Sequence, residues 1–296
     1  MIICAAVAGL LASYSPFLAL IFILAYGGKY HASHKYVFYL VFLGISLGFV
    51  FLVRGSIQVE NYVFDPRFLY HLPASDVIFG TLLPAYLFGE LRSKGKSYLN
   101  SILLILPLGI FYSFFRKYFF GEIEFASFRQ ILAYAVNDMP EVETTKALFT
   151  SSLDLYSKLS VGLWGAVASL SLYVGALLRS RRSSKKWEHR KVRLPFYLIY
   201  VVIPTLVLVA LPNTRYTGFN LALVLVPVYA MQGYSILHYY LGKLFARNRI
   251  ITGLMITFSA LNGQILLLIS FVGLFDTWFD FRKLNNTEEI NEGHIS

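Results

Sequence analysis

Long apolar stretches that lack Asp, Glu, Lys and Arg alternate with short polar segments along the chain. Seven of them are long enough to cross a bilayer, which takes about 20 mostly apolar residues. They are Ile2–Tyr26, Tyr36–Val53, Tyr98–Phe115, Leu159–Leu178, Pro195–Leu211, Tyr216–Leu241 and Ile250–Phe275. An eighth stretch, Val77–Gly89, is shorter and is flanked by Asp76 and Glu90.

This pattern predicts an all-α, polytopic transmembrane helical bundle with about eight spans. Hydrocarbon offers no water to the backbone, so each span has to satisfy its own hydrogen bonds as a helix. We expect a single transmembrane domain over residues 1–284 and a polar, disordered tail over residues 285–296. The first stretch is either one helix or two half-helices divided at Pro16.

The composition excludes an ordinary soluble domain. Of the 296 residues, 57% are hydrophobic and 14% are charged, and the mean hydropathy is +0.61. Soluble domains average about 25% charged residues. The net charge of +10 favours contact with anionic lipid over contact with nucleic acid, because basic residues collect in the cytoplasmic loops of membrane proteins.

The distribution of basic residues predicts the sidedness. Segment Arg179–Arg193 contains eight Lys or Arg and one Glu, which marks it as cytoplasmic by the positive-inside rule. Counting spans from this segment places Arg116–Lys158 outside, as expected for a multi-pass protein of the cytoplasmic (inner) membrane. Arg282 and Lys283 after the last span disagree with the count, so the side of the C-terminus stays open.

Apolar residues recur at helical spacing within the predicted outer segment. Phe125, Phe128, Leu132, Ala135 and Val136 share one face, which predicts a short helix after the span that ends at Phe115. It either lies in the membrane interface or packs over the bundle. The stretch Asn137–Asp154, rich in acids, is expected to be an exposed loop.

The sequence contains no recognisable catalytic motif. Neither a phosphate-binding P-loop nor a His-Glu-x-x-His zinc motif occurs, so we expect a protein that is not an enzyme and has no metal or cofactor. His31 and His34 lie close together, but a solvated cytoplasmic loop explains them better than a metal site does.

Polar residues within the last two spans are candidates for binding a ligand, because burying them is unfavourable unless they find partners. They are Asn220, Gln232, Ser235, Asn262 and Gln264. Two explanations remain open. One is hydrogen bonding between helices, with Gly233 allowing a close approach, and the other is a polar pocket between spans.

The end of the last span is distinctive. Asp276, Trp278, Asp280 and Arg282 lie within seven residues, where the helix is expected to leave the bilayer. We interpret them as a structural or docking motif, with Trp278 at the level of the headgroups. We expect Asp276 or Asp280 to pair with a basic residue on another span or loop and so to attach the last helix to the bundle.

The C-terminal third resembles the YybS-like family of bacterial membrane proteins. The likeness rests on Pro204, Asn220, Gln232-Gly233 and the ending Gly273-Leu-Phe-Asp276-Thr-Trp278-Phe-Asp280-Phe-Arg282. Such proteins are similar in build to the S components of energy-coupling-factor transporters and, more loosely, to the rod-shape protein MreD. The S-component likeness implies a small-molecule pocket open to the outer face and a partner protein that supplies ATP hydrolysis.

Two functions follow as hypotheses. The first is a transport-type protein that binds a small molecule between its helices without an ATPase of its own. The alternative is a non-transporting scaffold, similar to MreD, that holds cell-envelope assembly partners. A polar cavity would favour the first, whereas a filled interior would favour the second.

Overall fold

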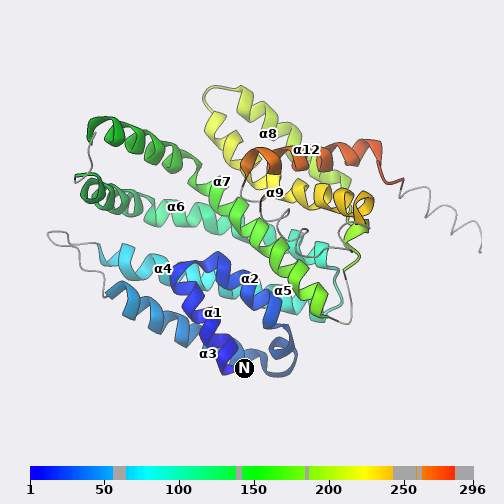
Figure 1. Cartoon of the computed structure of the whole chain (residues 1–296), viewed down its shortest axis with the longest axis horizontal. Helices are drawn as coiled ribbons and strands as arrows, with labels where there is room; N and C mark the ends of the chain where they lie inside the picture. Colours follow the sequence, from blue (N-terminus) through cyan, green and yellow to red (C-terminus); the bar gives the residue numbers. More distant parts are fainter. Residues whose placement is uncertain (56–64, 138–141, 184–186, 243–257, 259–261, 284–296) are drawn as a thin grey trace, which may run out of the picture. The chain divides into compact units, whose positions relative to one another are not determined.

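The computed structural model describes residues 1–55, 65–137, 142–183, 187–242, 258 and 262–283. All regular secondary structure within these ranges is helical, as predicted (Figure 1). The chain divides into two compact units, Met1–Lys186 and Trp187–Ser296, and each is described by itself. The predicted tail, 285–296, lies outside the described residues.

The first unit begins with two short helices, α1 (Ile2–Tyr14) and α2 (Pro16–Tyr26). The break falls at Ser15, whose backbone is extended and whose hydroxyl accepts a hydrogen bond from the N–H of Leu18. Pro16 starts α2 because its fixed φ suits a first helical position, where the missing N–H costs nothing. The first predicted span is therefore two helices, each shorter than the bilayer core.

Helix α3 (Gly28–Gly55) begins earlier than predicted and has a kink at His34. It is followed by one continuous helical segment, which consists of η1 (Arg67–His71), α4 (Leu72–Ser75), η2 (Asp76–Leu82) and α5 (Leu83–Ser93). Both η1 and η2 are π-helical. Pro73 and Pro84 follow them closely, and proline cannot donate the usual i→i−4 hydrogen bond. The short eighth stretch is thus the middle of a longer helical segment.

Helices α6 (Tyr98–Asn137) and α7 (Val142–Arg182) form a long hairpin, drawn in green in Figure 1. At 1.5 Å per residue each is about 60 Å long, twice the hydrocarbon thickness of about 30 Å. Two predictions were wrong here. The helix over 125–136 is the continuation of α6 rather than a separate interfacial helix, and most of the expected loop 137–154 belongs to α7. Their polar residues keep the helical backbone because the two helices pack against each other.

The second unit contains η3 (His189–Lys191), η4 (Phe196–Leu198), α8 (Ile199–Ala210), α9 (Arg215–Tyr240) and α12 (Gly263–Phe279). Helix α9 packs against both α8 and α12. The first half of the last predicted span lies almost entirely outside the described residues.

Five of the described helical segments are long and apolar enough to cross a membrane. They are Gly28–Val53, Arg67–Ser93, Tyr98–Ala133, Ala147–Arg182 and Arg215–Tyr240. Four shorter apolar helices are Ile2–Tyr14, Pro16–Tyr26, Phe196–Ala210 and Gly263–Phe279. The prediction of an all-α polytopic bundle is confirmed.

Two glycines lie at a close approach of α9 and α12 in the second unit. A Cβ added at Gly273 would collide with the backbone carbonyl of Tyr229, and one at Gly233 with the carbonyl of Ile269. Replacing Gly273 by Ala should therefore separate α9 from α12 and lower the free energy of unfolding by about 1–3 kcal/mol or more. Denaturant titration in mixed micelles measures this loss.

Gly263→Ala is the matched control for this prediction, because it lies on the same helix and a Cβ there would meet open space. Its stability should stay constant or rise by up to about 1 kcal/mol, since alanine restricts the unfolded chain more than glycine does. Equal stability of the two variants would show that the close approach is not needed.

Candidate functional site

Two of the predicted ligand residues, Gln232 and Ser235, lie in a buried polar network in the second unit. Its members are Gln232 and Ser235 on α9, Asp276 on α12, Arg282 just after α12, and the backbone of residues 189–194. We call it the Arg282 network. Gln232 is fully buried, and both the nitrogen and the oxygen of its side-chain amide form hydrogen bonds. Its Nε2 donates to Asp276 Oδ2 at 2.8 Å, while its Oε1 accepts from the N–H of Leu194 at 2.8 Å.

Arg282 is the centre of this network and is 3% exposed. It donates to Asp276 Oδ2 at 2.7 Å, to the carbonyls of Arg190 and Val192 at 2.9 Å each, and to the Ser235 hydroxyl. Ser235 in turn donates to the carbonyl of His189 at 2.6 Å. The guanidinium therefore joins the end of α12 to α9 and to the segment before η4.

The terminal motif contains a buried ion pair, and the structure gives the partner of its Asp276. Asp276, 1% exposed, does form an ion pair, but its partner is Arg282 of the same motif rather than a base on another span or loop. The motif reaches the other elements through Arg282 and through the Gln232 amide. Asp280 ends α12 in the left-handed conformation, with φ at 41°, and Trp278 is exposed.

The other three predicted ligand residues lie elsewhere. Asn220 donates to the carbonyl of Tyr216 on its own helix. Asn262 caps α12 by accepting from the N–H groups of Gln264 and Ile265, and Gln264 is exposed at that end of the helix. The structure thus brings together Gln232 and Ser235 only.

A second buried network lies in the first unit and was missed by the sequence analysis. Arg116 on α6 faces two carboxylates. Its Nη1 and Nη2 donate to Glu124 at 2.6 and 2.9 Å, and its Nε donates to Asp76 Oδ1 at 3.0 Å. Arg116 is 7% exposed and Glu124 is 3% exposed. We call this set, with the residues in the next paragraph, the Arg116 network.

Aromatic and hydroxyl groups complete the Arg116 network. The Tyr112 hydroxyl lies 2.6 Å from Asp76 Oδ1 and 2.9 Å from the Ser75 hydroxyl. Tyr156 on α7 donates to Glu124 at 3.5 Å, and Trp164 lies against the guanidinium at 4.7 Å. An arginine on an aromatic face is an attractive contact, more so where water is excluded.

A sequence signal for this network exists. Tyr112, Arg116 and Glu124 are spaced i, i+4, i+12, which places them on one face if the helix continues past Phe115. The predicted end of the span at Arg116 hid this face, because the charges were taken as the boundary of the membrane. Intramembrane ionisable residues are functional candidates by default, which makes this network the leading one in the first unit.

A third cluster corrects the prediction of a solvated loop around His31. His31 is buried in α3, where its Nε2 lies 3.5 Å from Glu90 Oε1 and its ring packs against Tyr39. Lys35 binds the same Glu90 oxygen at 2.7 Å. His34 is exposed. Within the described ranges, no three His, Cys, Asp or Glu side chains converge as metal ligands would.

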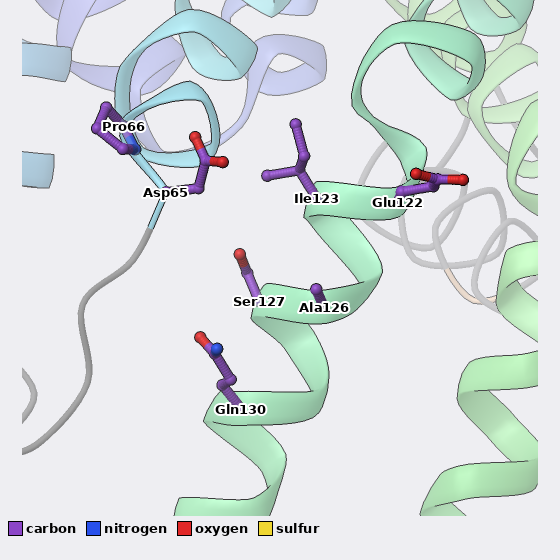
Figure 2. A pocket seen from close by; sticks show the side chains of 7 residues that line it. All are labelled: Asp65, Pro66, Glu122, Ile123, Ala126, Ser127 and Gln130. Atoms are coloured by element: carbon purple, nitrogen blue, oxygen red, sulfur yellow. The ribbon is translucent and has the colours of Figure 1, made fainter.

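An open groove of about 510 Å³ lies between the start of η1 and the second half of α6. Figure 2 shows Asp65 and Pro66 on one side and Ile123, Ser127 and Gln130 on the other. Glu122 and Ala126 complete the lining. Arg67 forms an ion pair with Asp65. The side chain and the backbone N–H of Arg67 also donate hydrogen bonds to the Asp65 carboxylate, and they lower its pKa. The groove thus presents an ionised acid, a hydroxyl and an amide.

Comparison with known proteins identifies one family. Its sequence profile, described as that of predicted membrane proteins (DUF2232), matches residues 74–277, a range that contains the ionic groups of the Arg116 network and Gln232, Ser235 and Asp276. No curated protein and no solved structure matches the chain. The resemblance to the YybS-like family of polytopic membrane proteins is confirmed. The chain belongs to the DUF2232 family of predicted membrane proteins.

Proposed function

We propose that this chain is a non-transporting scaffold of the cytoplasmic membrane, without catalytic activity of its own, that holds cell-envelope assembly partners. The observation that carries this proposal is that the side-chain amide of Gln232 has no free hydrogen-bonding atom for a ligand. Both ends of its amide are bonded within the chain, to Leu194 and to Asp276. A residue that serves a transported ligand would keep a donor or an acceptor open toward a cavity.

The hairpin of α6 and α7 is the surface that we expect to contact a partner. About half of each helix extends past the length needed to cross the hydrocarbon. This part carries exposed apolar side chains, which include Ile131 on α6 and Leu148 and Leu155 on α7. Apolar groups that face water rather than lipid are typical of interaction sites.

Site-specific photo-crosslinking in living cells tests this proposal. A photoreactive amino acid at Leu148 or Leu155 should give a discrete adduct with the same envelope-assembly protein. Leu206 on α8 and Leu268 on α12 are matched controls, because both are leucines at least as exposed as Leu155 but lie on apolar helices. The scaffold proposal fails if the hairpin positions give no protein adduct, or give the same adducts as the controls.

The transport-type function remains a second candidate, supported by the groove in Figure 2. The groove is open, has polar groups in its lining, and lies in the part of the first unit predicted to be external. On this proposal it receives a small molecule, and a partner ATPase supplies the energy. Native mass spectrometry after mild extraction should then detect a bound small molecule.

A bulky side chain in the groove separates the two candidates. Gln130→Trp should displace the molecule, whereas Arg129→Trp, on the neighbouring exposed residue outside the lining, should not. Retention of the molecule by both variants, or its absence from the unmodified protein, would remove the support that the groove gives to transport.

A further inference from the structure

We propose that Asp76 is a proton-binding site: at neutral pH its carboxyl group holds a proton, while Glu124 stays ionised against Arg116. The first argument is the count of charges. The network contains two carboxyl groups and one guanidinium, and the side chains of Asp76, Arg116 and Glu124 are 12%, 8% and 4% exposed. With both acids ionised, one negative charge would be buried without a partner, which is strongly unfavourable.

No second cation in the described part of the chain corrects this balance. Arg116 pairs with Asp76 and also with Glu124, and both Arg116 and Glu124 lie on α6. Helix α7 contributes the hydroxyl of Tyr156 and the ring of Trp164. A proton is the simplest positive charge that neutralises the network.

The geometry indicates which acid holds the proton. Glu124 accepts both terminal nitrogens of Arg116, one on each oxygen, and this two-point pairing is the strong interaction of an ionised carboxylate. Arg116 and Tyr112 both contact Asp76 at one oxygen, Oδ1. None of the described residues donates to its Oδ2. Protonating Glu124 would break the better ion pair, so Asp76 is the acid that carries the proton.

The second argument is a count of hydrogens. Three oxygen–oxygen contacts run in a chain, from Asp76 Oδ1 to Tyr112 at 2.6 Å, to Ser75 at 2.9 Å and to the carbonyl of Leu72 at 2.8 Å. Tyr112 and Ser75 supply one hydroxyl hydrogen each, which leaves one contact without a hydrogen. A proton on Asp76 fills it: Asp76 donates to Tyr112, Tyr112 to Ser75, and Ser75 to Leu72.

The position of Asp76 in the helix supports a functional role. Asp76 is the first residue of the π-helical segment η2. Such segments are rare within helices and occur frequently at functional sites. Arg116 lies about 27 Å along α6 from Tyr98, near the predicted outer end of the hydrocarbon. Loss of the proton would place an uncompensated negative charge between η2 and α6. This inference does not depend on the proposed scaffold function.

Infrared spectroscopy of the reconstituted protein tests the assignment. At pH 8, exposed Asp and Glu side chains, with ordinary pKa values near about 4, are ionised. The protein should nevertheless show the C=O stretch of a protonated carboxylic acid. Labelling the side-chain carboxyl of aspartate with ¹³C should shift this band, and the same label in glutamate should not. The labels act on the unmodified protein, so this result does not depend on a variant that folds.

Variants then locate the proton within the chain. Asp76→Asn should abolish the band, whereas Asp276→Asn should keep it, since Asp276 is balanced one to one by Arg282. A shift with labelled glutamate, a band that persists in Asp76→Asn, or no band in any buffer would overturn the proposal. A band that appears only when sodium is replaced by choline would also overturn it, in favour of a site for a metal cation.

Discussion

Replacing Arg116 by Gln should lower the free energy of unfolding by about 3–5 kcal/mol, because it leaves Glu124 ionised, buried and without its partner. This is a large fraction of the 5–15 kcal/mol that typically separates a folded protein from its unfolded state. We expect a lower melting temperature in detergent and a reduced amount of protein in the membrane. Denaturant titration in mixed micelles gives the size of the loss.

Lys117→Gln is the matched control for Arg116→Gln. It removes one positive charge from the neighbouring residue, whose side chain is exposed. Its effect should stay within about 0.5 kcal/mol, as for most surface substitutions. Comparable losses in both variants would mean that overall charge matters and that the buried network does not.

Asp276→Ala should have an effect of similar size in the second unit. The substitution removes the acceptor of Arg282, Gln232 and the N–H of Phe281 at the same time. Arg282 would then be a buried cation without a counter-charge, for which the expected loss is again about 3–5 kcal/mol. The free energy of unfolding is the measured quantity here as well.

Glu188→Ala provides the comparison for Asp276→Ala within the same unit. It breaks an ion pair with Lys191 whose two side chains are about 70% exposed. Water and salt screen such pairs, so the expected loss is at most about 1 kcal/mol. If Asp276→Ala and Glu188→Ala cost the same, the Arg282 network contributes no more than a surface contact.

The fold could be predicted because the absence of charge over long stretches leaves the helix as the only workable backbone structure. Apart from the break at Ser15 and a few residues at helix ends, the described parts of all eight apolar stretches are helical. The ends of the helices were harder to predict. Arg116 and Asp154 looked like parts of polar loops, yet each lies within a helix of 40 or 41 residues. Composition marks where hydrocarbon ends, but packing between α6 and α7 decides where the helix ends.

The candidate site was predicted in part for a related reason. Gln232, Ser235, Asp276 and Arg282 were recognised because polar residues in or beside an apolar stretch stand out. Asp76, Arg116 and Glu124 were missed because they come from segments about 40 residues apart and meet only through tertiary packing. The pair of Asp276 with Arg282 was not foreseen, because the chain turns after Asp280 and brings Arg282 to the end of the helix.

The position of Arg282 in the chain has a consequence for biosynthesis. The Arg282 network of the second unit is complete only when Arg282 bonds to the carbonyls of Arg190 and Val192, which are synthesised some ninety residues earlier. Until the ribosome has passed that codon, the Gln232 Nε2 group lacks Asp276 and the carbonyls of Arg190 and Val192 lack Arg282, so these groups are open to lipid, water or a chaperone. Quality control of the nascent protein could therefore act at a single late step, since an unfinished chain presents unpaired polar groups that the finished chain conceals.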